Sequence, residues 1–235
     1  MSDHHETAKQ AIKENWGDFF KRKSYKVTHR LKNVNELTSL NYDLFILDRD
    51  CTLQEYHGKR RVLEFEETLK AIDLKSELVS NSSYEELLKI RDLYGDLMPI
   101  SKLVKFNGFN NPHLIRFVDG KLTILSYNDI LGRVNDVTTL MSQEDKLFGG
   151  IRYNSKKPNP QIIKSVIATN IYTGRINENA NILMVGDRYF TDIVAGNLAG
   201  IYAARVKPYK PLSDKPDLIA MRIIDSLVGN IASRL

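Results

Sequence analysis

The chain has 235 residues and a formal net charge of +5, with 42% hydrophobic and 27% charged residues. A chain of this length and composition can bury the core of one globular domain, and no stretch approaches the roughly 20 apolar residues that a membrane span requires. The single cysteine, Cys51, excludes an internal disulfide and is typical of a reducing compartment.

The elements predicted before residue 96 alternate between helices and strands. Residues 6–23 are expected to form a helix, because apolar residues recur there at spacings of three and four. We interpret residues 24–40 as an irregular linker. After it we predict a strand at 43–48, a loop at 54–61, a helix at 63–73, a strand at 77–80 and a helix at 83–94.

The pattern changes between residues 96 and 155. Two β-rich runs, 113–118 and 121–127, flank the dipeptide Asp119-Gly120, which favours a tight hairpin turn. This hairpin interrupts the alternation of helices and strands. We therefore interpret it as an accessory insert, in the place of a small cap, and not as a pair of core strands.

The alternation returns after residue 155. We predict a helix after Pro160, a strand at 181–185, a helix at 190–199, a strand at 202–206 and an amphipathic helix at 217–235. The apolar residues of that last helix share one side: Leu218, Met221, Ile224, Val228 and Ile231.

Alternating strands and helices predict a parallel three-layer α/β sandwich. We assign its core to residues 41–95 and 151–235. Residues 1–40 are expected to be a helical and basic extension, and residues 96–150 the insert.

Polar side chains follow the predicted buried strands in four segments. Asp48 and Asp50 follow the apolar run 44–47, and Ser80 and Asn81 follow the next run. Lys157 precedes a proline, and Asp187 ends a third apolar strand, with Asp192 five residues on. Functional groups of parallel sheets lie just beyond the carboxyl ends of the strands, so these segments predict a catalytic site.

In this order, the segments resemble the four motifs of the haloacid dehalogenase (HAD) superfamily of phosphohydrolases, over the chain from Asp43 to Val206. The fourth is the run VGDRYFTDI at 185–193, followed by NLAG at 197–200. It is similar to the pattern of the phosphatidylglycerophosphate (PGP) phosphatase branch, found in mitochondria and many bacteria. Members of that branch dephosphorylate PGP on the way to phosphatidylglycerol and cardiolipin.

The resemblance implies a HAD-like Rossmannoid α/β/α fold and a Mg²⁺-dependent phosphomonoester hydrolase with an aspartyl-phosphate intermediate. Asp48 would be the nucleophile and Asp50 the general acid and base. Mg²⁺ prefers oxygen ligands, and the superfamily pattern assigns it to Asp48, Asp50 (through its backbone carbonyl) and Asp187. Asp192 would bind the metal through water or orient a ligand.

The same resemblance assigns the phosphate to Ser80, Asn81 and Lys157. Ser80 would donate a hydrogen bond to a phosphate oxygen, and Lys157 would hold the charge of the phosphate and of Asp48. Lys156 is the competing lysine, and Lys157 is favoured because it directly precedes the proline.

Two departures from the branch leave other functions open. Cys51 stands where the branch usually has asparagine, and we interpret it as a packing residue, with a redox switch as the alternative. Ser80 and Lys157 are separated by 77 positions, more than a member without a cap is expected to have. A cap would favour a soluble sugar or nucleotide phosphate over a lipid, and a non-catalytic binding module is the third hypothesis.

Two basic segments bear on the partners of the protein. Residues 21–32 hold six lysines and arginines and no acid, and Lys59-Arg60-Arg61 form the second cluster. Such clusters attract phosphorylated ligands or anionic membranes, and a solvated surface is the alternative. We expect a lipid head-group substrate, docking on anionic membranes through residues 6–32, and no nucleic acid. The competing interpretation is that the apolar stripe of this segment packs on the enzyme itself.

The start of the chain bears on the location of the protein. Residues 1–6 have no apolar signal core, and early acids argue against a transit peptide. We therefore expect a cytoplasmic protein at the periphery of a membrane, with the mitochondrial matrix as the alternative.

Overall fold

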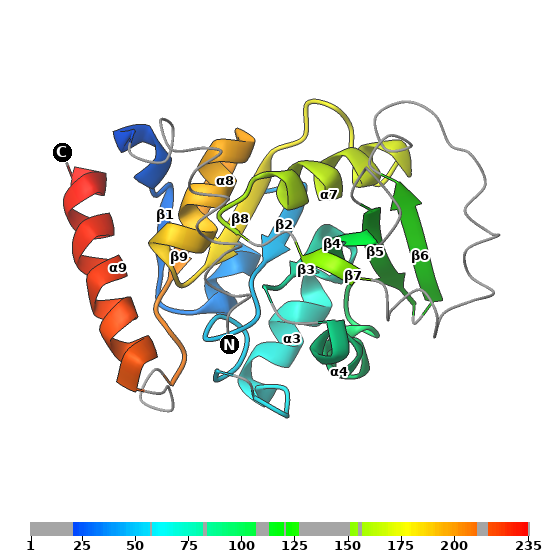
Figure 1. Cartoon of the computed structure of the whole chain (residues 1–235), viewed down its shortest axis with the longest axis horizontal. Coiled ribbons are helices and arrows are strands. Elements are labelled where there is room, and N and C mark those ends of the chain that lie inside the picture. The colour runs from blue at the N-terminus through cyan, green and yellow to red at the C-terminus, as the bar shows by residue number, and fades with distance from the viewer. Residues whose placement is uncertain are drawn as a thin grey trace.

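A nine-stranded sheet forms the centre of the protein (Figure 1). The computed structural model describes residues 21–56, 58–81, 84–106, 113–119, 121–126, 151–154, 157–210 and 216–234. The strands follow one another across the sheet in the order β1 (His29–Leu31), β9 (Tyr202–Val206), β8 (Ile182–Gly186), β2 (Leu44–Leu47), β3 (Ser76–Val79), β4 (Ile100–Phe106), β5 (His113–Val118) and β6 (Lys121–Ser126). Strand β7 (Ile151–Asn154) pairs with β4.

Across the sheet, the six strands β1, β9, β8, β2, β3 and β4 run parallel to one another. Strands β5, β6 and β7 add antiparallel pairs. The helices are η1 (Arg22–Tyr25), η2 (Val34–Ser39), α3 (Leu63–Ala71), η3 (Asp73–Lys75), α4 (Tyr84–Tyr94), α7 (Gln161–Tyr172), η6 (Tyr189–Ile193), α8 (Val194–Ala199) and α9 (Pro216–Arg234).

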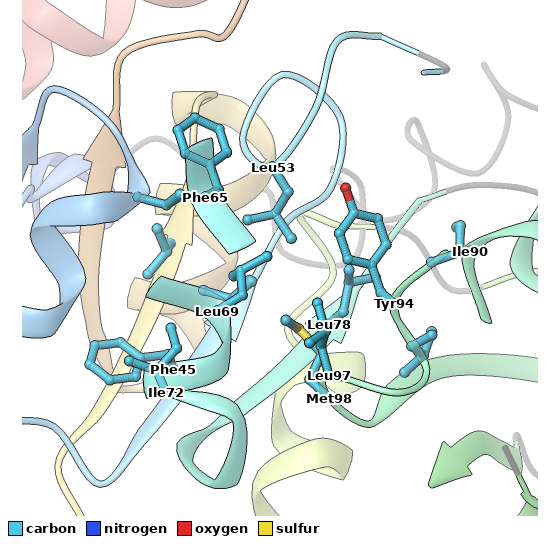
Figure 2. Packing of buried hydrophobic residues seen from close by; sticks show 14 of the residues in the cluster. Phe45, Leu53, Phe65, Leu69, Ile72, Leu78, Ile90, Tyr94, Leu97 and Met98 are labelled. Atoms are coloured by element: carbon cyan, nitrogen blue, oxygen red, sulfur yellow. The ribbon is translucent and has the colours of Figure 1, made fainter. Parts of the chain in front are cut away.

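Both faces of the central strands are covered, as their continuous apolar sequences predict. Phe45 and Leu47 of β2 pack with η2, α3 and α4 on one face, and Figure 2 shows this cluster around Phe65 and Tyr94. The alternate residues of β2 point to α7 and α8 on the other face. The predicted α/β fold with a largely parallel central sheet is therefore confirmed.

The interpretation of residues 24–40 as an irregular linker is wrong. This segment contains β1, which pairs with β9 at the edge of the sheet, and η2, whose Val34 and Leu37 are fully buried in the core. The helix expected at 6–23 lies mostly outside the described residues. Its described end belongs to the short 3-10 helix η1.

The hairpin at residues 113–126 extends the central sheet, which corrects its interpretation as strands separate from the core. Val118 pairs with Lys121 across a tight turn, and β5 pairs with β4. Arg116 of the hairpin forms a buried ion pair of 2.8 Å with Glu77 of β3. Residues 127–150 lie outside the described residues, so a cap over the site, like the division into core, extension and insert, stays a prediction.

The last helix is confirmed, but its apolar side faces outward. Ile224 is 52% exposed and Ile231 is 59% exposed, whereas Asp225 on the opposite side is buried. Gly229 allows this orientation, because a Cβ atom there would lie 2.0 Å from the ring of Tyr189. The inner side of α9 is therefore polar and closely packed against η6. Among the described helices, none is both long and apolar enough to cross a bilayer.

Candidate active site

Three carboxylates converge at the carboxyl edge of the sheet. Strands β2 and β8 are neighbours, and the N–H of Asp48 donates to the carbonyl of Val185 at 2.9 Å. Asp48 and Asp187 therefore leave the two strands side by side. Asp192 joins them from η6, and one oxygen of each carboxylate lies within 4.8 Å of the others. The sequence predicted all three residues for this site.

Lys157 lies at the centre of this carboxylate cluster, which we define as Asp48, Asp187 and Asp192. Its Nζ donates to Asp48 Oδ1 and, at 2.7 Å, to Asp192 Oδ1, and its side chain is fully buried. Burial lowers the pKa of Lys157, but the charges of Asp192 and Asp48 outweigh it and leave this pKa above its ordinary value. The ammonium group therefore stays charged and neutralises part of the cluster.

Asn81 holds the backbone of Lys157 in place. Its side-chain oxygen accepts from the N–H of Lys157 at 2.8 Å, and its amide nitrogen donates to the carbonyl of Lys157 at 3.2 Å. A direct contact of Asn81 with phosphate stays a prediction, and the structure adds this positioning contact. Ser80 is buried at the end of β3, on the same edge of the sheet as Asp48. Lys156 lies outside the described residues.

Gly186 is required by the position of Asp192. A Cβ atom at residue 186 would lie 2.3 Å from the carboxylate of Asp192. Asp192 Oδ1 accepts from Lys157, and Asp192 Oδ2 accepts from the N–H of Arg188 at 3.1 Å. The short π-helix η6, which starts at Tyr189, thus folds Asp192 back over the end of β8.

Burial and mutual repulsion raise the pKa of two carboxyls in the cluster. Desolvation raises the pKa of Asp48 to about 7; the charge of Lys157 acts in the opposite direction, and Asp192 adds to the rise. Desolvation likewise raises the pKa of Asp187 to about 7, against the charge of Arg222. The site therefore concentrates more negative charge than its own cations balance.

These carboxylates fit a bound cation. Asp187 Oδ1 is buried and has no hydrogen-bond partner among the described residues. Carboxylate oxygens are the ligands that hard divalent cations prefer, and a cation would offset the desolvation and repulsion that raise the two pKa values. Asp48, Asp187 and Asp192 could therefore hold a metal ion.

Asp50 follows Asp48 but belongs to a different contact network. Both of its oxygens accept from Arg49, at 3.0 Å from Nε and 2.8 Å from Nη2, and Arg49 also pairs with Glu86 of α4 at 3.4 Å. The fork of Arg49 orients the Asp50 carboxylate. Cys51 next to it is fully buried and has a φ of +58°, a conformation in which asparagine is much more common.

Two residues of α9 that contact this site were not identified from the sequence. Arg222 donates to Asp187 Oδ2. Asp225 accepts from the N–H groups of Tyr189, at 2.9 Å, and Phe190, at 2.6 Å, at the start of η6. A helix pattern shows that these residues share a side, but only the tertiary fold shows what that side contacts.

The basic cluster at residues 59–61 is divided between two roles. Lys59 and Arg60 are exposed. Arg61 donates to the carbonyl of Leu93 and to Asp96, at the end of α4. Arg61 therefore fastens the loop after Asp50 to α4, while the first two side chains remain available to a ligand.

One of three comparisons with known proteins gave a match. Residues 117–208 match the family model described as mitochondrial PGP phosphatase. The comparisons with curated proteins and with solved structures gave no match. The matched range contains Lys157, Asp187 and Asp192, and the fold brings Asp48 and Ser80, which precede it, to the same edge of the sheet. We therefore identify the chain as a phosphatase, similar to the mitochondrial PGP phosphatases, with the α/β fold that the HAD superfamily predicts.

Proposed function

We propose that the protein is a Mg²⁺-dependent phosphomonoester hydrolase that removes the terminal phosphate of PGP through an aspartyl-phosphate intermediate. The observation that carries the proposal is the carboxylate cluster around Lys157, in which Asp48 Oδ1 contacts the lysine and three carboxylates share one small volume. Phosphoryl transfer needs this combination of a positioned nucleophile and compensating positive charge.

The chain supplies the covalent steps. Asp48 attacks phosphorus and the bond from phosphorus to the glycerol oxygen breaks. Asp50, which must leave its ion pair with Arg49 and take up a proton from solvent for this step, gives that proton to the leaving alkoxide. Asp50 then takes a proton from the water that attacks the aspartyl-phosphate, which releases inorganic phosphate and restores both carboxyls. Lys157 favours the ionised, nucleophilic form of Asp48 because it donates to it.

Mg²⁺ held by Asp48, Asp187, Asp192 and the backbone carbonyl of Asp50 would supply the positive charge that lets a phosphate approach these acids. Ser80 would donate to a phosphate oxygen. Asn81 would act through Lys157, whose backbone it holds.

A lipid substrate implies a membrane surface, and we place the enzyme at the periphery of an anionic membrane. The family description names mitochondria, which supports the matrix as its location. Residues 6–32 were predicted to make the membrane contact. Residues 6–20 of that segment lie outside the described part of the chain, and Lys21, Lys23, Lys26 and Lys32 of the remainder are exposed.

Phosphate release from a panel of esters tests this function. The panel contains PGP in detergent micelles, a sugar phosphate and a nucleoside monophosphate, each assayed with and without Mg²⁺. We expect the highest kcat/KM for PGP and no turnover after EDTA treatment. A higher kcat/KM for the sugar or nucleotide would instead establish a soluble HAD phosphatase, the second hypothesis, and no release from any ester would contradict both.

A further inference from the structure

The outer face of α9 is a continuous apolar surface. It consists of Ile223, Ile224, Leu227, Val228 and Ile231, each at least 41% exposed. They recur at spacings of one and three, so they lie on one side of the helix. Only four other large hydrophobic residues in the described part of the chain are exposed, and they lie on separate elements. Single exposed apolar residues are common in soluble proteins, whereas a contiguous patch marks a contact surface.

The orientation of α9 is determined by its polar side. Arg205 donates to Ser226 at 2.8 Å, and the Tyr189 hydroxyl donates to Asn230 at 2.8 Å. Asp225 accepts from two backbone N–H groups of η6. Rotation of the helix to bury its apolar face would break all of these bonds. The apolar face therefore stays outward, and α9 lies at the edge of the molecule (Figure 1).

Positive charge lies at both ends of this helix. Helix η1 packs against α9, and Lys21, Lys23 and Lys26 in and beside η1 are exposed. Lys207 and Lys210 are exposed in the segment that leads into α9 from β9. Among the side chains of α9 that the structure describes, the acidic one is that of Asp225, and it is buried. The apolar face is thus flanked by exposed cations and presents no described acid.

We propose that the outer face of α9 docks the enzyme on an anionic lipid surface, with the helix lying in the plane of the interface. A helix that combines an apolar side with flanking lysines binds in this way. The inference rests on the proposed lipid substrate, whose phosphate must reach the site from a membrane. A second copy of the chain on this face would bring like-charged lysines together, so charge favours the lipid.

Helix α9 carries both the proposed membrane contact and a residue that contacts the carboxylate cluster. Arg222 reaches Asp187 from the inner side of α9 and directly precedes Ile223 and Ile224, which lie on the outer side. Docking through α9 would therefore hold the carboxylate cluster close to the plane of the lipid head groups.

Vesicle co-sedimentation of the full chain tests the proposal. The variant Leu227→Asp with Ile231→Asp places two acids on the outer face. The control, Leu63→Asp with Leu74→Asp, changes two leucines that are more exposed than Leu227 and Ile231 but lie on α3 and η3. We expect wild type and control to bind vesicles containing phosphatidylglycerol at low salt, more weakly at high salt, and not to bind pure phosphatidylcholine. The α9 variant should bind at least tenfold more weakly.

Three results would overturn the proposal. The first is equal vesicle binding by the α9 variant and the wild type. The second is loss of binding on removal of residues 1–20 with no effect of the α9 substitutions, which would assign the contact to the N-terminal segment. The third is a wild-type dimer that the α9 variant converts to a monomer while vesicle binding is unchanged, as light scattering would show.

Turnover in the absence of a membrane separates this proposal from the proposed function. The α9 variant should hydrolyse PGP in detergent micelles at the wild-type rate, because its two substitutions lie on the outer side of the helix. If no variant releases phosphate from PGP but the wild type still binds vesicles through α9, the substrate assignment fails and the docking surface stands. If PGP is hydrolysed but the α9 substitutions do not change vesicle binding, the docking surface fails and the substrate assignment stands.

Discussion

Arg222 of α9 donates to the carboxylate of Asp187 at the end of β8, so the last helix of the chain contributes a positive charge to the carboxylate cluster. The other oxygen of Asp187 has no partner among the described residues. Arg222 therefore neutralises one side of a carboxylate whose other side is available to a metal ion.

The first prediction concerns the competition between Arg222 and a cation. Arg222→Gln keeps a hydrogen-bond donor near Asp187 but removes a positive charge from the site, and a unit charge about 4 Å away is worth on the order of 4 kcal/mol at an effective dielectric constant of about 20, before solvent screening. We expect Mg²⁺ to bind roughly tenfold more tightly to this variant, as titration calorimetry would measure. Arg188→Gln, in the adjacent loop, is the control for a general charge effect. Weaker binding by Arg222→Gln would show that the arginine positions Asp187 for the metal.

The second prediction concerns pH and metal removal. Because the pKa values of Asp48 and Asp187 are raised to about 7, the folded protein binds protons that the unfolded chain has already released above pH ~4. By linkage, the free energy of unfolding of the metal-free protein falls as pH rises from about 4 to 7, by on the order of a few kcal/mol. We expect Tm in EDTA to be several degrees lower at pH 8 than at pH 5.

Mg²⁺ should reverse this trend, since it binds the ionised carboxylates and stabilises the folded state by mass action. Asp187→Asn should flatten the pH dependence in EDTA and raise Tm at pH 8. A metal-free protein whose Tm increases steadily from pH 5 to pH 8 would contradict the charge repulsion described for the cluster.

The third prediction concerns the buried ammonium of Lys157. Lys157→Met keeps the length of the side chain but leaves the carboxylates of Asp48 and Asp192 without their shared cation. Loss of one partner of a buried ion pair costs about 3–5 kcal/mol, so we expect a large loss of stability at pH 8 and a smaller one at pH 5, where the carboxyls take up protons. Lys164→Met, an exposed lysine of α7, is the matched control. Equal Tm values for the two variants at pH 8 would disprove this role.

The fourth prediction follows from the correction of the hairpin. Arg116→Met should destabilise the fold by at most about 3–5 kcal/mol, because it removes the nearer cation of the buried Glu77 and leaves Arg175 at 3.5 Å. The double variant with Glu77→Gln should recover part of the loss, measured by chemical denaturation. If Arg116→Met unfolds like the wild type, the hairpin is an accessory element, as its sequence pattern first indicated.

Two residues of the carboxylate cluster could be predicted because they follow continuous apolar runs. Such runs become buried parallel strands, and the carboxyl ends of parallel strands meet at one edge. Asp48 and Asp187 were found in this way, and Asp192 by its place in the motif five residues after Asp187. Strand β1 could not be predicted from the sequence, because His29–Leu31 is only three residues long and has a polar pattern. It is a strand because it pairs with β9.

The orientation of α9 shows a second limit of sequence patterns. Spacing identifies the residues that share a side of a helix, but not the side that faces the protein. Here the N–H groups at the start of η6 and the carboxylate of Asp187 contact Asp225 and Arg222, which outweighs burial of the apolar side. The interpretation of the hairpin was wrong for the same reason. The sequence shows its turn, but only the tertiary fold shows that β5 pairs with β4.

Acid-quenched mass spectrometry of the enzyme mixed with PGP and Mg²⁺ tests the central claim most directly. We predict that the peptide containing Asp48 gains one phosphoryl group that hydroxylamine removes. The modified fraction should increase in Asp50→Asn, because the water that attacks the intermediate loses its base. Asp48→Asn should remain folded by circular dichroism, with no phosphorylation and no turnover. Phosphorylation of another residue, or turnover by Asp48→Asn within tenfold of the wild type, would contradict the assignment of Asp48 as the nucleophile.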